Sequence, residues 1–210
     1  MSVSALPIAS NPVDIPDYLI KEVIDGYPVY YKGYRDVLKQ IKTPPEIMAD
    51  GLLQAIIKSW LQSLLIRQLQ PNQYWVLAGE VGAHVSHKNN MAHDLMVIDK
   101  RKLPPSEINN RYARVPADLV IEIDTEVEFG TSGNMEQYVQ RKTQNALDFG
   151  VGKVVWFFTE TQKVMVATSN TDWSISAWNK TIDLLDGVQA NMAEYLASEG
   201  IVLDNPGENP

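Results

Sequence analysis

The run Pro116–Glu126, PADLVIEIDTE, constrains the fold more than any other part of the chain. Leu119–Ile123 is apolar apart from Glu122, which is typical of a strand buried on both faces. Side chains alternate along a strand, so two opposite rows are expected. One row holds Leu119, Ile121, Ile123 and Val127, and the other holds Asp118, Val120, Glu122, Asp124, Glu126 and Glu128.

The acidic row is costly in a buried strand, because each carboxylate loses hydration and repels the next. A divalent cation would offset both effects, and Glu122 is the most informative member because Ile121 and Ile123 flank it. An edge strand whose acidic face is solvated would produce the same pattern. The residues alone leave both interpretations open.

A second acid, Asp94, opens the apolar run Leu95–Ile98. It precedes Glu122 by 28 residues (122 − 94), which suits a neighbouring strand reached through a long loop. Carboxylates on adjacent strands can share a Mg²⁺ ion through oxygen ligands. The alternative is that Asp94 is a turn residue after Asn89 and Asn90.

Lys142 lies within a stretch, 135–149, whose apolar residues recur at helical spacing. A lysine that reaches a metal site can orient a water molecule or stabilise charge on a phosphate. The alternative is an ordinary surface lysine beside Arg141.

The remaining pattern predicts one α/β domain, on the border of α+β, with a mixed central sheet flanked by helices. Thr43-Pro44-Pro45-Glu46 is a helix start with a capping box, and Asp50-Gly51 is expected to divide that helix, which ends near Leu69. The domain is expected to span 17–203, between flexible tails at 1–16 and 204–210. The other expected elements are a helix at 33–41, a loop at 100–116, and strands at 27–31, 74–78, 81–85, 94–98, 119–123, 154–158, 164–168 and 173–177.

Composition excludes several classes of protein. With no cysteine, the chain has no disulfide framework, thiolate zinc site or cysteine nucleophile. The formal charge of −8 argues against sequence-independent duplex binding through a basic surface, but allows an enzyme with a local basic cleft. The chain shows neither a signal peptide nor a bilayer-spanning run, so we expect a cytoplasmic protein without membrane contact.

The segments HDLMVID, PADLVIEID, RKTQNALDFGVGKVVWFF and KVMVA, in this order, resemble the Uma2 family (DUF820), as does the earlier LIKEVIDGYPV. The resemblance covers roughly residues 18–195. Members of this family look like restriction-endonuclease-type PD-(D/E)XK nucleases. Asp94, Asp118, Glu122, Lys142, Gly150, Val151 and Trp156 stand at the places of the family motifs.

The resemblance implies a Mg²⁺-dependent endonuclease, with Mn²⁺ as a possible substitute, that hydrolyses phosphodiester bonds in DNA. It implies that Asp94, Glu122 and the backbone carbonyl of Ile123 hold the metal, and that Lys142 orients the attacking water or stabilises the transition state. Asp124 would bind a second metal or help to take a proton. A homodimer would cover duplex DNA better than one small acidic domain.

The chain departs from the family pattern in three places. His93 replaces the usual proline before Asp94, and Asp124 replaces the motif lysine, whose ammonium Lys142 would supply from the helix. Residues 51–69 contain no acid. The candidates to fill that role are Glu46, Asp50 and Gln54, and Glu80 is another possible ligand.

Two alternatives remain. The first is a catalytically inactive nuclease fold that serves binding or assembly, because fold does not dictate function. The second is an independent zinc site made by His84, His87 and His93, for which proximity in sequence is weak evidence.

Overall fold

The computed structural model describes residues 15–86, 89–123, 127–128 and 134–203. Both expected tails, apart from residues 15 and 16, lie outside these ranges. The strands are β1 Ile20–Ile24, β2 Tyr27–Tyr31, β3 Tyr74–Ser86, β4 Asn89–Asp99, β5 Leu119–Ile123, β6 Val127–Glu128, β7 Lys153–Phe158, β8 Lys163–Ala167, β9 Ser174–Ala177, β10 Ile182–Leu185 and β11 Val188–Ala190. The helices are α1 Tyr34–Leu38, α2 Pro44–Met48, α3 Leu52–Gln68, α4 Met135–Phe149 and α5 Met192–Ser198, with single 3₁₀ turns at Asp17–Leu19 and Pro105–Glu107.

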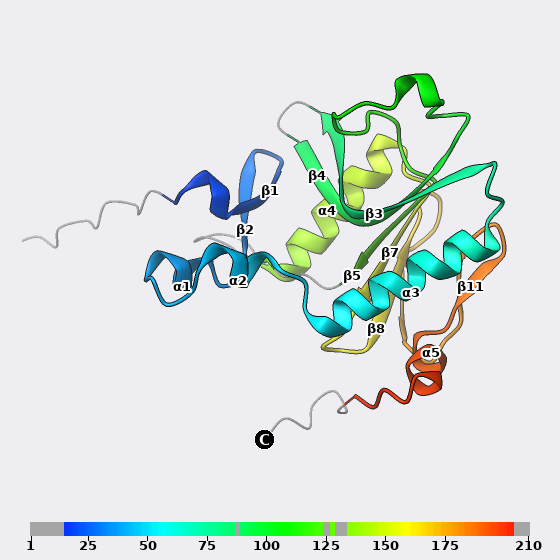
Figure 1. Cartoon of the computed structure of the whole chain (residues 1–210). Helices are drawn as coiled ribbons and strands as arrows, with labels where there is room; N and C mark the ends of the chain where they lie inside the picture. The colour runs from blue at the N-terminus through cyan, green and yellow to red at the C-terminus, as the bar shows by residue number, and fades with distance from the viewer. Residues whose placement is uncertain (1–14, 87–88, 124–126, 129–133, 204–210) are drawn as a thin grey trace, which may run out of the picture.

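Nine strands form one mixed sheet in the order β6-β2-β1-β4-β5-β7-β8-β9, with β3 paired to β4 (Figure 1). The pair β5 and β7 is parallel, and α4 is the crossover between them. All other described pairs of this sheet are antiparallel. The expected mixed α/β sheet flanked by helices is confirmed.

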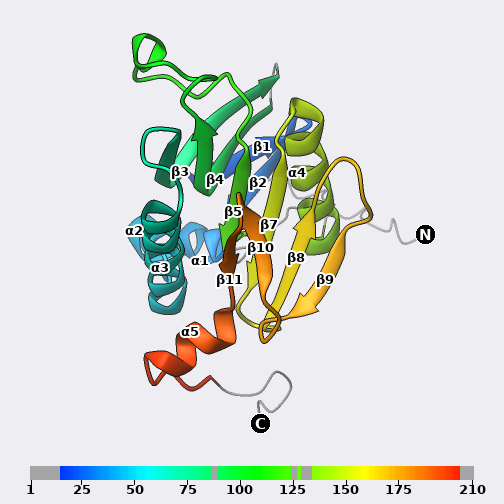
Figure 2. The same ribbon diagram turned by 90° about the vertical axis from the view of Figure 1, so that its right-hand side faces the viewer.

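The two faces of β5 face two different cores, as the alternation predicted. Leu119, Ile121 and Ile123 pack into the core under α3, whereas Val120 packs into the core under α4. Figure 2 shows α3 and α4 on opposite sides of the sheet. Because β5 lies between β4 and β7 and is buried throughout, the interpretation of a solvated edge strand is wrong.

Several local signals are also confirmed. The Glu46 carboxylate accepts hydrogen bonds from the backbone N–H and hydroxyl of Thr43, so α2 begins at the expected capping box. The chain breaks between α2 and α3 at the predicted Asp50-Gly51. The hairpin of β8 and β9 matches the expected pair of strands.

Several expected boundaries were wrong. Strand β4 begins at Asn89 and not at residue 94, and the helix expected at 33–41 is the shorter α1. The separate strands at 74–78 and 81–85 are a single strand, β3, interrupted by a β-bulge at Gly79 and Glu80. Both bulge residues have positive φ, +100° and +53°. A bulge bends the strand and interrupts the pairing only locally. The bulge lies opposite Asp94, because Ala78 pairs with Leu95 and Val81 pairs with His93.

Within the described residues, no helix is both long and apolar enough to cross a membrane.

Candidate functional site

The candidate site lies at residues 91–94 of β4, where β5 and β1 diverge on one edge of that strand; we call this place the fork. Strand β3 pairs with one edge of β4 over almost its whole length. The opposite edge of β4 pairs with β5 at Leu95–Val97 and with β1 at Asn90. Residues 91–94 lie between these two pairings, so β4 has no strand partner there on that edge.

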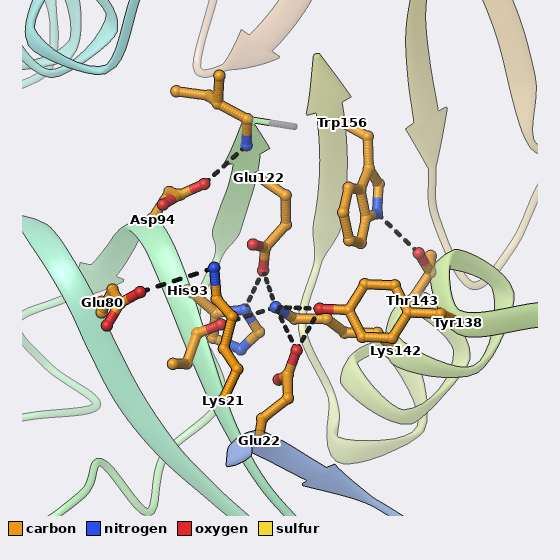
Figure 3. Close-up of polar contacts among 12 residues, drawn as sticks. Lys21, Glu22, Glu80, His93, Asp94, Glu122, Tyr138, Lys142, Thr143 and Trp156 are labelled. Carbon is orange, nitrogen blue, oxygen red and sulfur yellow. Dashed lines mark hydrogen bonds and ion pairs between the residues drawn. The ribbon is translucent and has the colours of Figure 1, made fainter. Parts of the chain in front are cut away.

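Side chains satisfy the backbone groups that the fork leaves unpaired, as buried polar groups require. The N–H of Ile123 donates to Asp94 Oδ2 at 2.8 Å. The carbonyl of Ile123 accepts from Gln54 Nε2 at 2.8 Å. The carbonyl of Ala92 accepts from Lys142 Nζ at 2.8 Å. Figure 3 shows Asp94 and Lys142 among the side chains that converge from the strands and from α4, whereas Gln54 reaches the Ile123 carbonyl from α3.

Lys142 and Glu122 form a buried ion pair at the centre of the site. Lys142 Nζ lies 3.2 Å from Glu122 Oε1, and His93 Nδ1 lies 2.5 Å from the same oxygen. Burial alone would raise the pKa of Glu122, but the charge of Lys142 and the hydrogen bond from His93 outweigh it and hold the pKa below its usual value. Burial opposes the charged form of Lys142 too, yet Glu122 and Glu22 hold its pKa well above the usual value.

Lys142 therefore contacts one carboxylate of the predicted pair, Glu122. The interpretation of a surface lysine is wrong, because Lys142 is 3% exposed. Part of the buried charge of Glu122 is offset without a divalent cation. The protein supplies its own cation, Lys142, because α4 crosses the sheet beside β5.

Asp94 lies inside β4, so the alternative of a turn residue is wrong. Its Oδ1 lies 2.9 Å from Lys58 Nζ, which also contacts Asp50 at 2.7 Å. Burial and the neighbouring charge of Glu122 raise the pKa of Asp94, although Lys58 acts in the opposite direction. The effect of Glu122 means that the two carboxylates lie close enough to repel each other.

Sequence reasoning missed Glu22, which enters the site from β1. Glu22 Oε1 lies 3.3 Å from Lys142 Nζ and accepts a hydrogen bond from the hydroxyl of Tyr138. Its second oxygen is buried without a hydrogen-bond partner among the described residues. The signal that would have found Glu22 is the early motif LIKEVIDGYPV, in which it is the only glutamate.

Aromatic rings line the site on the side of α4. Lys142 Nζ lies 5.7 Å from the ring centroids of both Tyr138 and Trp156. The indole N–H of Trp156 donates to Thr143 Oγ1 at 2.9 Å, which fixes the ring (Figure 3). Trp156 is 1% exposed and serves packing.

The other candidate residues lie in different settings. Glu80 lines the pocket beside Asp94, where its carboxylate is 3.8 Å from Lys21 Nζ. Glu46 caps α2 and takes no part in the site. Asp124 and His87 lie outside the described residues. His84 contacts Asn90 and His93 contacts Glu122, so these two histidines have separate partners.

The candidate Mg²⁺ donors among the described residues of the fork are the oxygen atoms around Asp94. Among the described residues, no three His, Asp or Glu side chains form a group that could hold a metal ion. A site would combine Asp94, Glu122 and the Ile123 carbonyl, all oxygen donors of the type that Mg²⁺ prefers. Gln54 donates a hydrogen bond from Nε2 to that carbonyl. Its Oε1 is buried and has no hydrogen-bond partner within the described structure. The donor chemistry fits, provided that Lys58 and Gln54 release their partners.

The cavity between these groups is small. Its volume is about 10 Å³, which is about the space that a single water molecule needs. The site as it stands accommodates one water or ion and no larger group.

A comparison with known structures supports the assignment of the fold. No protein-family model matches the chain, and no curated protein matches it. Among solved structures, the crystal structure of a DUF820 protein from Anabaena variabilis ATCC 29413, described as a proposed nuclease, is similar with a TM-score of 0.61. The identity is 14%, over 83% of this chain and 88% of that chain. The chain therefore has the fold of that DUF820 structure, as the sequence resemblance implied.

Proposed function

We propose that this chain is a Mg²⁺-dependent nuclease that hydrolyses phosphodiester bonds in DNA. The observation that carries the proposal is the convergence of Asp94, Glu122 and Lys142 at the fork between β4 and β5. These residues come from separate elements, and an ordinary packed core gives no reason for so many charged groups to meet. The DUF820 structure with the same fold, itself described as a proposed nuclease, supports the same activity.

In this proposal Asp94, Glu122 and the carbonyl of Ile123 hold the Mg²⁺ ion, with Mn²⁺ as a substitute. The bound ion would lower the pKa of a water molecule and neutralise charge on the phosphate. Lys142 adds a fixed positive charge beside the phosphate and takes the place of the motif lysine that Asp124 replaces. Glu22, with Tyr138, holds the ammonium of Lys142 in position.

One observation favours the alternative of a binding or assembly protein on the same scaffold. Each metal-binding carboxylate already has a cationic partner in the protein, Lys58 for Asp94 and Lys142 for Glu122. Such a neutralised cluster is stable without metal, so it suits a structural role as well. For the nuclease we also propose a homodimer, because two copies would cover duplex DNA better than one small acidic domain.

The test is a calorimetric titration with Mg²⁺ of the wild type and of Glu122→Ala, followed by cleavage assays on linear and supercoiled DNA with Mg²⁺ or Mn²⁺. A nuclease gives saturable heat and cleavage in the wild type alone. Neither heat nor cleavage in the wild type would leave the binding or assembly protein as the better description.

A further inference from the structure

A groove runs between β3 and the loop 100–116, on the far side of β3 from β4. It has a volume of about 580 Å³. Its lining includes Trp75, Leu77, Gly82, Arg111, Tyr112 and Arg114. It is much larger than the cavity at the fork.

The loop 100–116 is basic in an acidic protein. It holds Lys100, Arg101, Lys102, Arg111 and Arg114 against a single acid, Glu107, whereas the whole chain carries −8. Arg101 pairs with Asp99, and Lys102 pairs with Asp118. Within the described residues, Arg111 and Arg114 form no ion pair, and both line the groove with Glu107. The groove thus presents two exposed guanidinium groups that suit phosphates.

Tyr112 offers an aromatic face in the same groove. Its ring lies against Gly82, where an added Cβ would come within 2.3 Å of the ring. The side chain is nevertheless 56% exposed, so the ring is supported on one side and open on the other. An exposed and supported ring of this kind is a platform on which a nucleobase can stack.

Backbone hydrogen bonds fix this part of the loop to β3. The N–H of His84 donates to the carbonyl of Ala113, and the N–H of Ala113 donates to the carbonyl of Gly82, at 2.8 and 2.9 Å. Ala113 lies between Tyr112 and Arg114, so the ring and both guanidinium groups start from an ordered backbone. These side chains then lose less conformational freedom when a ligand binds in the groove.

The groove continues toward the site. Tyr112 also lines a second hollow of about 600 Å³, together with Lys21, Glu22 and Ala92. Lys21 and Ala92 in turn line the small cavity at the fork, where the Ala92 carbonyl binds Lys142. A chain of nucleotides laid along the groove would therefore lead to Lys142.

We infer that this groove binds a single-stranded stretch of the nucleic-acid substrate, with Arg111 and Arg114 on its phosphates and Tyr112 stacked on a base. A basic groove with an exposed aromatic ring is the arrangement that binds single strands without sequence preference. The inference rests on the proposed function for the identity of the ligand. The capacity of the groove to hold phosphates and a stacked ring rests on Arg111, Arg114 and Tyr112 alone.

The test measures binding by fluorescence anisotropy of a labelled oligo(dT) longer than about 16 nucleotides, a length that fills one single-strand site. EDTA is present, so binding is separated from cleavage. Arg111→Ala/Arg114→Ala is expected to reduce the slope of log K against log salt by about 1.4, at about 0.7 per single-strand phosphate contact. Tyr112→Leu is expected to weaken binding about 5- to 150-fold, and Tyr112→Phe to leave it almost unchanged.

The matched control is Lys39→Ala/Arg67→Ala, which removes two exposed cations outside the groove and should preserve the slope. Wild-type binding that the groove variants leave unchanged would overturn the inference, as would no binding of oligo(dT) by the wild type. If instead the groove variants lose binding while the wild type cleaves no DNA with Mg²⁺ or Mn²⁺, the groove stands and the proposed nuclease activity fails.

Discussion

The ammonium of Lys142 lies 3.2 Å from the carboxylate of Glu122, and both side chains are almost completely buried. The strand β5 and the helix α4 that carry them meet where β4 changes partner from β5 to β1. Each charge is stabilised by the other, so removing either one takes away a partner of the remaining charge in a place that water barely reaches.

Replacing Glu122 with glutamine is expected to lower the free energy of unfolding by about 3 kcal/mol, because Lys142 loses a buried partner and keeps only Glu22. Urea unfolding at neutral pH measures the change. Glu160→Gln, at an exposed position after β7, is the control and should have almost no effect. An unchanged or higher stability of Glu122→Gln would show that repulsion from Asp94 outweighs the pairing.

The effect of Mg²⁺ on the melting temperature should distinguish the proposed nuclease from a binding or assembly protein. If Glu122 is a ligand, millimolar Mg²⁺ raises the melting temperature of the wild type alone, since a ligand that binds only the native state adds about 2.7 kcal/mol at a hundredfold excess over Kd. Thermal melts of wild type and Glu122→Gln, with and without Mg²⁺, measure this. No shift in the wild type would contradict the metal site.

The pH dependence of stability should have opposite signs at the two carboxylates. The pKa of Glu122 lies below its ordinary 4.5, so its contribution is complete above that pH and is lost as the pH falls through the folded-state pKa. The pKa of Asp94 lies above its ordinary 3.8, so its contribution is present below that pH and is lost as the pH rises through the folded-state pKa.

The stability difference between wild type and Glu122→Gln should therefore shrink on acidification, and that between wild type and Asp94→Asn should grow. Urea unfolding of the three proteins across the acidic range measures both slopes. Parallel slopes for the two variants would contradict the opposite pKa shifts.

Lys58 is expected to compete with a metal ion for Asp94. Replacing it with methionine removes a positive charge 2.9 Å from Asp94 Oδ1, which should tighten Mg²⁺ binding by about tenfold or more at an effective dielectric constant near 20. Calorimetric titration measures the affinity, and Lys39→Met, at an exposed position, is the control. Weaker Mg²⁺ binding by Lys58→Met would place the metal away from Asp94.

Lys142 is expected to act on the reaction and not on the metal. Lys142→Ala should reduce DNA cleavage by about a hundredfold or more, the usual loss when a charge-stabilising donor is removed, while Mg²⁺ binds at least as tightly. Arg141→Ala, at the exposed neighbouring position on α4, should cleave normally. Circular dichroism checks that Lys142→Ala is folded, and equal cleavage by the folded variant and the wild type would refute the role.

The fold was predictable where local signals and burial agree. The apolar run of β5, the capping box of α2 and the spacing of α4 each specify their element without help from distant residues. Strand β1 was missed because Lys21 and Glu22 make it read as polar, and only the packing of Glu22 against Lys142 explains why a glutamate is tolerated there. The bulge at Gly79 and Glu80 was read as a gap between strands, since a positive φ looks the same in a turn.

The sequence predicted which residues form the site better than it predicted the contacts between them. Alternation along β5 and the helical spacing of α4 made Glu122 and Lys142 candidates, and only the structure shows that both are buried. Nothing in the sequence indicated that His93 would bind Glu122, because that contact depends on the register of β4 against β5. Nor did it indicate that Lys58 would reach Asp94, because that contact depends on where α3 crosses the sheet. The gap between two pairings on one edge of β4 is likewise a property of the whole sheet.

The distance along the chain between Glu22 and Lys142 has a consequence for synthesis. At the ribosome, roughly ten seconds separate the appearance of these two residues, at about 5–20 residues per second. Strands β1, β4 and β5 are therefore made before α4 exists, and the ammonium that completes the fork arrives last. Under the proposed nuclease function, this order would keep the nascent chain without its full set of charged groups until translation has passed α4.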